Sequence, residues 1–338
     1  MVTLADVARH AGVSKTQVSF VLNQKNLHLV SAERRTRIAQ SIRDLDYRPN
    51  LAARHLAGKS TRLLGLLLPA GAIPVHGPII QAALTTARMR GYQMIVNTVP
   101  SAEDALANAL AQLEPYDLDG VICFARGMLG HADNLGEQLE RFRRVVTIGS
   151  PNAGHTRIGP DHRAAMRSVV HYLADTGRQR IGMILPVGHE HGLDDRILGV
   201  DLATEDLGWS RNDEFTVRLP RSADPWPDSA DTQSAIDRLV LEAGVDAIIA
   251  YDDIWAARIV QMLQRGGWKI PREVAVVGYG NLPIAELTAP ALTTVDLQER
   301  HMGLMAVDHL ITAIEDNQPL THDTVLTVES RMVSRASA

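Results

Sequence analysis

The sequence predicts two parts of different fold class: a small all-α headpiece and a larger α/β core of two doubly wound parallel-sheet subdomains. Two observations predict this division. Residues 3–23 carry the apolar spacing and the turn residues of two short helices joined tightly. From residue 63 onward, apolar strand-like runs alternate with helix-like segments, the order that builds parallel sheets covered by helices on both faces.

The headpiece pattern begins at Thr3, which can cap a helix, while Asp6 favours the positive end of its dipole. Gly12 ends this first helix, and Ser14 caps a second one. The arrangement is that of a helix-turn-helix, whose second helix lies in the DNA major groove; the alternative is an ordinary helical hairpin. The inward residues are Leu4, Val7, Ala8, Ala11, Val18, Val21 and Leu22, and the outward ones include Lys15, Thr16, Gln17 and Phe20.

The charge distribution favours a nucleic-acid partner for the headpiece. The chain has a formal net charge of -5, but residues 1–60 contain ten Lys and Arg against four acidic residues. That segment therefore carries +6 and the remainder −11. A basic head on an acidic body is expected when only one module meets phosphate. Ser31 caps a third predicted helix, with Ile38, Ile42 and Leu45 inward and arginines outward.

The core is predicted from near-continuous apolar runs separated by amphipathic segments. Ligands of such sheets bind outside the carboxyl ends of the strands, here in the cleft between the two sets. Strands are expected at 63–69, 92–97, 120–125, 145–149, 180–186, 215–219, 247–251 and 274–279, and helices at 79–90, 102–113, 162–175, 195–207, 232–242 and 254–265.

Residues 3–69 closely resemble the lactose-repressor/galactose-repressor family of bacterial transcription regulators. The matching elements are DVA-x-x-AGVS, VS-x-VLN, YRPN-x-x-AR-x-LAGKST and the apolar strand that ends at Pro69. The resemblance implies a periplasmic-binding-protein-like core and a function in allosteric transcription regulation. The expected protein is a repressor that binds a palindromic operator as a dimer and is switched by a small polar metabolite.

The resemblance also implies domain boundaries. We expect a DNA-binding domain at 1–48, a hinge helix at 49–60, and an effector-binding and dimerisation core at 61–338. Three crossings between the subdomains are expected near Gly177, 294–296 and 319–323. The first subdomain is then 61–177 plus 296–320, and the second is 178–295 plus 321–338.

The family pattern assigns DNA contacts residue by residue. Lys15, Thr16 and Gln17 face the bases, and Leu56 enters the minor groove with Ala53 and Arg54 alongside. Most family members carry Arg where this chain has Phe20, which either touches a thymine methyl or packs on the third helix. Phosphate-binding positions are Thr3, Ser14, Ser19 and Asn23, and Tyr47 and Asn50 flank the hinge.

The family's effector cleft matches Asp161, Arg196 and Asp253, since Arg donates to planar or ring oxygens and Asp accepts from hydroxyls. Trp226 matches an aromatic that stacks on the ligand ring, or else anchors its loop. His76 and Tyr279 complete the expected set. Gly280 and Asn281 stand where the family has an acidic loop, so the effector is a sugar, a modified sugar, a nucleoside or another small polar metabolite.

Other function classes fit less well. The lone Cys123 excludes a disulfide framework, and no cofactor is expected. His189 and His191 lie near acids, but their spacing favours a polar loop over a metal site. An enzyme or a secreted binding protein is disfavoured because phosphate-binding glycines, a nucleophile elbow and a signal peptide are not visible. Without a long apolar run, a cytoplasmic protein with no membrane partner is expected. The tail after 330 lacks heptads, which favours a dimer over a tetramer.

Overall fold

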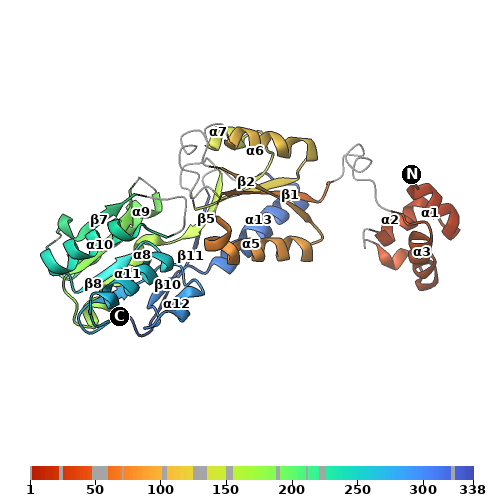
Figure 1. Ribbon diagram of the computed structural model, residues 1–338. Coiled ribbons are helices and arrows are strands. Elements are labelled where there is room, and N and C mark those ends of the chain that lie inside the picture. Colours follow the sequence, from red (N-terminus) through yellow and green to blue (C-terminus); the bar gives the residue numbers. More distant parts are fainter. Residues whose placement is uncertain are drawn as a thin grey trace. The chain divides into compact units, whose positions relative to one another are not determined.

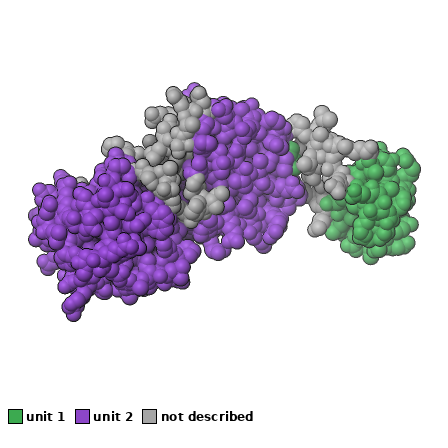
Figure 2. Space-filling view, viewed as in Figure 1, with its two compact units in different colours: residues 1–61 green, residues 62–338 purple. Residues whose placement is uncertain are grey.

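The chain consists of two compact units, residues 1–61 and residues 62–338, which are coloured separately in Figure 2. They are described here from a computed structural model. It describes residues 2–22, 26–47, 60–70, 72–100, 105–124, 135–149, 155–187, 191–210, 212–220, 226–320 and 324–338.

The first unit is the predicted helix-turn-helix (Figure 1). Thr3 and Asp6 form a capping box at the start of α1 (Leu4–Ala11), and Gly12 ends the helix in the left-handed region at φ 65°. Helix α2 (Lys15–Leu22) follows, then a 3-10 turn (Leu27–Leu29) and α3 (Ala32–Asp44). The expected inward face is confirmed, because the buried core is Val7, Ala8, Ala11, Val18, Val30 and Ile38.

The second unit contains a six-stranded, wholly parallel sheet in the order β11-β5-β4-β3-β1-β2. We call this sheet, with α5, α6, α7 and α13, the first subdomain. Its strands are β1 (Leu63–Pro69), β2 (Gln93–Val99), β3 (Gly120–Phe124), β4 (Val145–Ile148), β5 (Thr156–Pro160) and β11 (Val325–Val328), and its helices are α5 (Ala72–Met89), α6 (Ala105–Leu113), α7 (Leu135–Leu139) and α13 (Glu299–Glu315).

Alternate residues of these strands pack in opposite directions, as a sheet covered on both faces requires. Leu64, Leu66 and Leu68 of β1 belong to the same buried cluster as residues of α5 and α13. Leu67 of the same strand instead joins a cluster with residues of α6 and α7. The near-continuous apolar run of this strand therefore reflects burial from two sides (Figure 1).

The second subdomain is built on a four-stranded parallel sheet in the order β7-β6-β8-β9. A two-stranded antiparallel pair, β10 and β12, adjoins it through a bridge between Val277 and Thr293. The strands are β6 (Ile181–Pro186), β7 (Thr216–Leu219), β8 (Ala247–Ala250), β9 (Ala275–Val277), β10 (Thr294–Asp296) and β12 (Arg331–Val333), and the helices include α8 (His162–Asp175), α9 (His191–Asp206), α10 (Ser229–Ile236), α11 (Asp253–Arg265) and α12 (Ile284–Leu287).

Two of the expected crossings between subdomains were misplaced. The first follows β5 at Asp161 and not Gly177, because α8 packs against α9 of the second subdomain (Figure 1). Their contact is close: a Cβ at Gly199 would lie 2.5 Å from the carbonyl oxygen of Arg163. The segment 162–177 thus belongs to the second subdomain.

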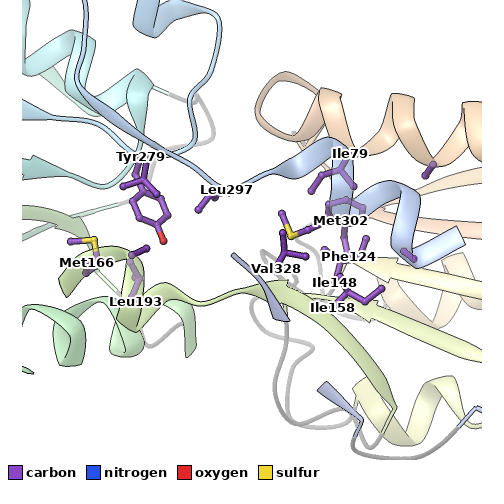
Figure 3. Close-up of a cluster of buried hydrophobic side chains, with 14 of the residues drawn as sticks. Ile79, Phe124, Ile148, Ile158, Met166, Leu193, Tyr279, Leu297, Met302 and Val328 are labelled. Atoms are coloured by element: carbon purple, nitrogen blue, oxygen red, sulfur yellow. The ribbon is translucent and has the colours of Figure 1, made fainter. Parts of the chain in front are cut away.

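The last crossing also lies later than the expected 319–323. Strand β11 pairs in parallel with β5, so it extends the sheet of the first subdomain and not the second. The chain then crosses before β12, which pairs with β10. The middle crossing follows β10 and leads through Leu297 into α13, which packs against α5. Figure 3 shows Leu297 on this connection, between Tyr279 and the side chains around Met302.

Among the described helices, none combines the length and the apolar character needed to cross a membrane.

Candidate functional site

The first turn of α2 is the candidate DNA-reading surface. The Ser14 hydroxyl accepts from the backbone N–H of Gln17 at 3.2 Å, and the Ser14 backbone N–H donates to Gln17 Oε1 at 3.4 Å. This reciprocal cap fixes where α2 begins. Lys15 and Thr16 are exposed beside it, whereas Gln17 is half-buried. The first turn therefore exposes the ammonium group of Lys15 and the hydroxyl and methyl groups of Thr16.

Phe20 is half-buried against the headpiece core, as is Tyr47. This packing favours the second of the two alternatives for Phe20. Ser19 is half-buried, and Thr3 is occupied in the capping box of α1. The remaining predicted DNA contacts, Asn23, Asn50, Ala53, Arg54 and Leu56, lie outside the described residues.

A small hollow in the second unit is the candidate effector site, and we call it the central hollow. Its lining comes from both subdomains, because α5 and α13 contribute on one side and α9 and the ends of β8 and β9 on the other. This is the carboxyl-end position expected for ligands of doubly wound sheets. The polar and aromatic lining residues are His76, Arg196, Tyr251, Asp252, Tyr279 and Glu299.

Arg196 is the most confined charge in this lining, with 1% of its surface exposed. Its guanidinium carbon lies 3.5 Å from the ring centroid of Tyr279 and 5.4 Å from that of Tyr251. Nη1 donates to the backbone oxygen of Tyr251 at 2.5 Å. The Tyr279 hydroxyl is in turn 2.6 Å from Nδ1 of His162. Stacking and hydrogen bonding therefore hold the guanidinium plane in one orientation.

Glu299, at the start of α13, lines the same hollow. Its Oε1 lies 3.0 Å from Nδ1 of His76, and the side chains are 6% and 14% exposed. The His76 ring also packs on Phe124, with centroids 5.7 Å apart. A helix N-terminus favours a carboxylate at this position. Sequence analysis did not identify Glu299, because an acid in a first helical turn is ordinary.

Asp253 does not line the central hollow, contrary to the expectation. It is fully buried and accepts hydrogen bonds from the Thr294 hydroxyl at 2.5 Å and the Leu282 backbone N–H at 2.6 Å. Burial raises its pKa to about 6. The preceding Asp252 lines the hollow and caps α11 by accepting from the Trp255 N–H at 2.8 Å. The second Asp of the pair turns inward because it is the first residue of the helix.

Two other predicted effector residues lie outside this lining. Asp161 caps α8 by accepting from the Ala164 N–H at 2.9 Å, and it lines a separate hollow with Arg157 and Arg163. Trp226 is 41% exposed, with the Arg258 guanidinium carbon 5.7 Å from its ring centroid. Arg196, His76 and Tyr279 are thus the predicted residues that meet in the central hollow.

No metal-binding cluster of three or more His, Cys, Asp or Glu side chains occurs in the part of the chain that the structure describes. His189 lies outside that part.

Family models match two stretches of the chain. Residues 3–50 match the model for bacterial regulatory proteins of the lacI family, and residues 170–338 match the model for a periplasmic binding protein-like domain. The chain belongs to the LacI family. The second model covers half of the chain, and the two occur in the order predicted from the sequence.

Curated relatives of the LacI family match nearly the whole chain. The transcriptional repressor PurR of Vibrio campbellii is 24% identical over 94% of this chain and 93% of its own. The NTD biosynthesis operon regulator NtdR of Bacillus subtilis is 28% identical over the full length of both.

Solved LacI-family structures show the same fold. The lac repressor dimer bound to operator and the anti-inducer ONPF has a TM-score of 0.77 at 23% identity, over 99% of this chain and 98% of its own. A LacI-type regulator from Bifidobacterium animalis has a TM-score of 0.67 at 28% identity, over 81% and 99%. The chain is thus a DNA-binding transcriptional repressor with a ligand-binding domain, not an enzyme.

Proposed function

We propose that this repressor binds a palindromic operator as a homodimer and is switched by a small polar metabolite in the central hollow. The observation that carries the proposal is the set of polar side chains from both subdomains around one hollow. A ligand that touches both subdomains stabilises one relative arrangement of them, which is what a switch requires. On this proposal the protein acts in the cytoplasm, where the chromosome lies.

For DNA reading we propose that Lys15, Thr16 and Gln17 meet base edges and that Thr3, Ser14, Ser19 and Asn23 contact phosphates. The packing of Phe20 on the core supports a structural role for it. One headpiece contacts few bases, so two headpieces on an inverted repeat supply useful specificity. We also propose a hinge helix that includes Ala53, Arg54 and Leu56, flanked by Tyr47 and Asn50, with Leu56 entering the minor groove.

For the effector we propose a sugar or sugar derivative. Arg196 is held in a fixed plane, which suits hydrogen bonding to ring or carboxylate oxygens. The carboxylates of Asp252 and Glu299 accept from hydroxyl or amine groups. Asp161 and Trp226 lie elsewhere in this unit, so we assign them structural roles. Asp161 caps α8, and Trp226 anchors its loop.

A gel-shift assay on promoter DNA beside the protein's own gene tests DNA binding. We expect binding to an inverted repeat, at least tenfold weaker binding by Lys15→Ala, and no loss with Lys269→Ala, a matched removal of a lysine from the other unit. Binding that ignores DNA sequence, or equal affinity of Lys15→Ala and the wild type, would contradict the assignment.

A thermal-shift screen of polar metabolites tests the effector site, because a ligand of the folded state raises the melting temperature. We expect a compound that raises it to change operator affinity in the same gel-shift assay. A metabolite that binds without changing operator affinity would argue against the switch.

A further inference from the structure

We infer that the effector carries a protonated amine, which the carboxylate of Glu299 receives in the central hollow. This inference rests on the proposed function, because it names the chemical class of ligand for the same site. It starts from a buried charged atom for which the described residues supply no partner.

That atom is Oε2 of Glu299. The side chain is 6% exposed, and its other oxygen, Oε1, lies 3.0 Å from Nδ1 of His76. Oε2 is buried and accepts no hydrogen bond from any of the described residues. Buried polar atoms normally have partners, and a carboxylate oxygen without one destabilises the protein unless a ligand supplies a donor.

The charges around Glu299 favour a cationic donor. Asp252 is the second carboxylate in the lining, and Arg196 is its arginine. The guanidinium lies against the face of Tyr279 and donates to the carbonyl of Tyr251, so both groups orient it within the second subdomain. Among the described residues of the lining, two carboxylates lie with one arginine and one histidine. A hydroxyl would supply a hydrogen bond, but an ammonium group also supplies the compensating charge.

The positions of these residues also suit a ligand that bridges the subdomains. Glu299 and His76 lie on helices of the first subdomain, whereas Asp252 and Arg196 lie in the second. The rings of Tyr251 and Tyr279 line the same hollow, and both lie against the Arg196 guanidinium. An amine-bearing polar metabolite, with hydroxyls toward Asp252 and Arg196, satisfies the donors and acceptors of both sides.

The test measures binding by calorimetry for matched ligands, using the full-length protein. The probes are glucosamine, N-acetylglucosamine and glucose, the same three forms of galactose, and a polar metabolite set divided equally between amine-bearing and amine-free compounds. We expect amine-bearing compounds to bind, and their acetylated or hydroxyl counterparts to bind at least tenfold more weakly.

Variants then assign this preference to Glu299. Glu299→Gln keeps the side-chain volume and should abolish the advantage of the amine over the hydroxyl form. Glu299→Asp keeps the charge and should retain that advantage at lower affinity. Glu242→Gln removes an exposed glutamate outside the hollow and should bind as the wild type does.

The outcomes separate this inference from the proposed function. A neutral or anionic compound that binds best and changes operator affinity overturns the amine and leaves the switch intact. An amine preference unchanged in Glu299→Gln also overturns the role of Glu299. If no compound binds and none changes operator affinity, both the inference and the proposed function fail. If Glu299→Gln does not fold, the inference is still tested by comparing the affinities of the amine and hydroxyl forms of each sugar for wild type and for Glu299→Asp.

Discussion

Replacing Asp253 by asparagine tests the electrostatics beneath the central hollow. Asp253 is fully buried, and its two oxygens accept from the Thr294 hydroxyl and the Leu282 backbone N–H. Asparagine has nearly the same shape. Its oxygen can accept from Leu282 while its amide donates to the Thr294 hydroxyl, which can turn to accept.

The expected magnitude follows from the pKa. Burial raises the pKa of Asp253 from 3.8 to about 6, and each pKa unit corresponds to about 1.36 kcal/mol. The folded state therefore holds the proton more tightly than the unfolded state does. The resulting stabilisation is fully present below pH 3.8 and is lost as the pH rises through about 6. At pH 8 the ionised carboxylate costs roughly 3 kcal/mol, a cost that Asp253→Asn removes.

Urea unfolding of wild type and Asp253→Asn between pH 4 and pH 8 measures this difference. We expect the variant to gain stability relative to wild type as the pH rises from about 4 to 6, and then to keep a constant advantage. An imperfect hydrogen bond in the variant would lower its free energy of unfolding by the same amount at every pH, so the rise with pH would remain. Asp316→Asn, an exposed control, should show no such rise. A difference independent of pH, or one that falls with rising pH, would refute the reasoning.

Three further predictions concern packing and caps. Arg196→Lys should weaken effector binding at least tenfold while operator binding persists, because an ammonium cannot stack on Tyr279 as a guanidinium does; unchanged effector affinity in calorimetry would refute this. Gly199→Ala should lower the free energy of unfolding by about 1–3 kcal/mol, since its Cβ would lie 2.5 Å from a backbone oxygen of the neighbouring helix, whereas Gly77→Ala meets nothing within 4 Å and should be nearly neutral. Equal free energies of unfolding of the two variants in urea would contradict the close contact between α8 and α9 at Gly199. Thr3→Ala should destabilise α1 by about 1 kcal/mol, seen as faster hydrogen exchange of its amides; unchanged protection would argue against the cap.

Local sequence signals were enough to predict the headpiece. The cap at Thr3, the turn at Gly12 and the apolar spacing each act over a few residues, and the structure confirms all of them. The alternation of strands and helices in the core was equally readable, because strands covered on both faces are apolar throughout. Strand β5 (Thr156–Pro160) was missed, since Arg157 and Gly159 interrupt its apolar character.

The crossings and the site depended on long-range packing, which local patterns do not encode. The apolar stripe of α8 fits either sheet, so the sequence did not indicate that α8 packs on α9. In the same way, two adjacent acids follow β8, and the sequence does not indicate which of them lines the hollow. Asp252 lines it and Asp253 is buried because α11 begins at Asp253. Glu299 enters the lining because α13 returns to the first subdomain from a distant part of the chain.

The position of β11 has a consequence for synthesis of the protein. The headpiece is complete once residue 61 has been made, but β5 lacks a neighbour on one side until Val325–Val328 emerges from the ribosome. The apolar face of α5 likewise waits for α13. An unpaired strand edge and an uncovered helix face are the surfaces on which nascent chains aggregate. The packing partners of the DNA-binding unit are therefore all available in the growing chain well before those of the core.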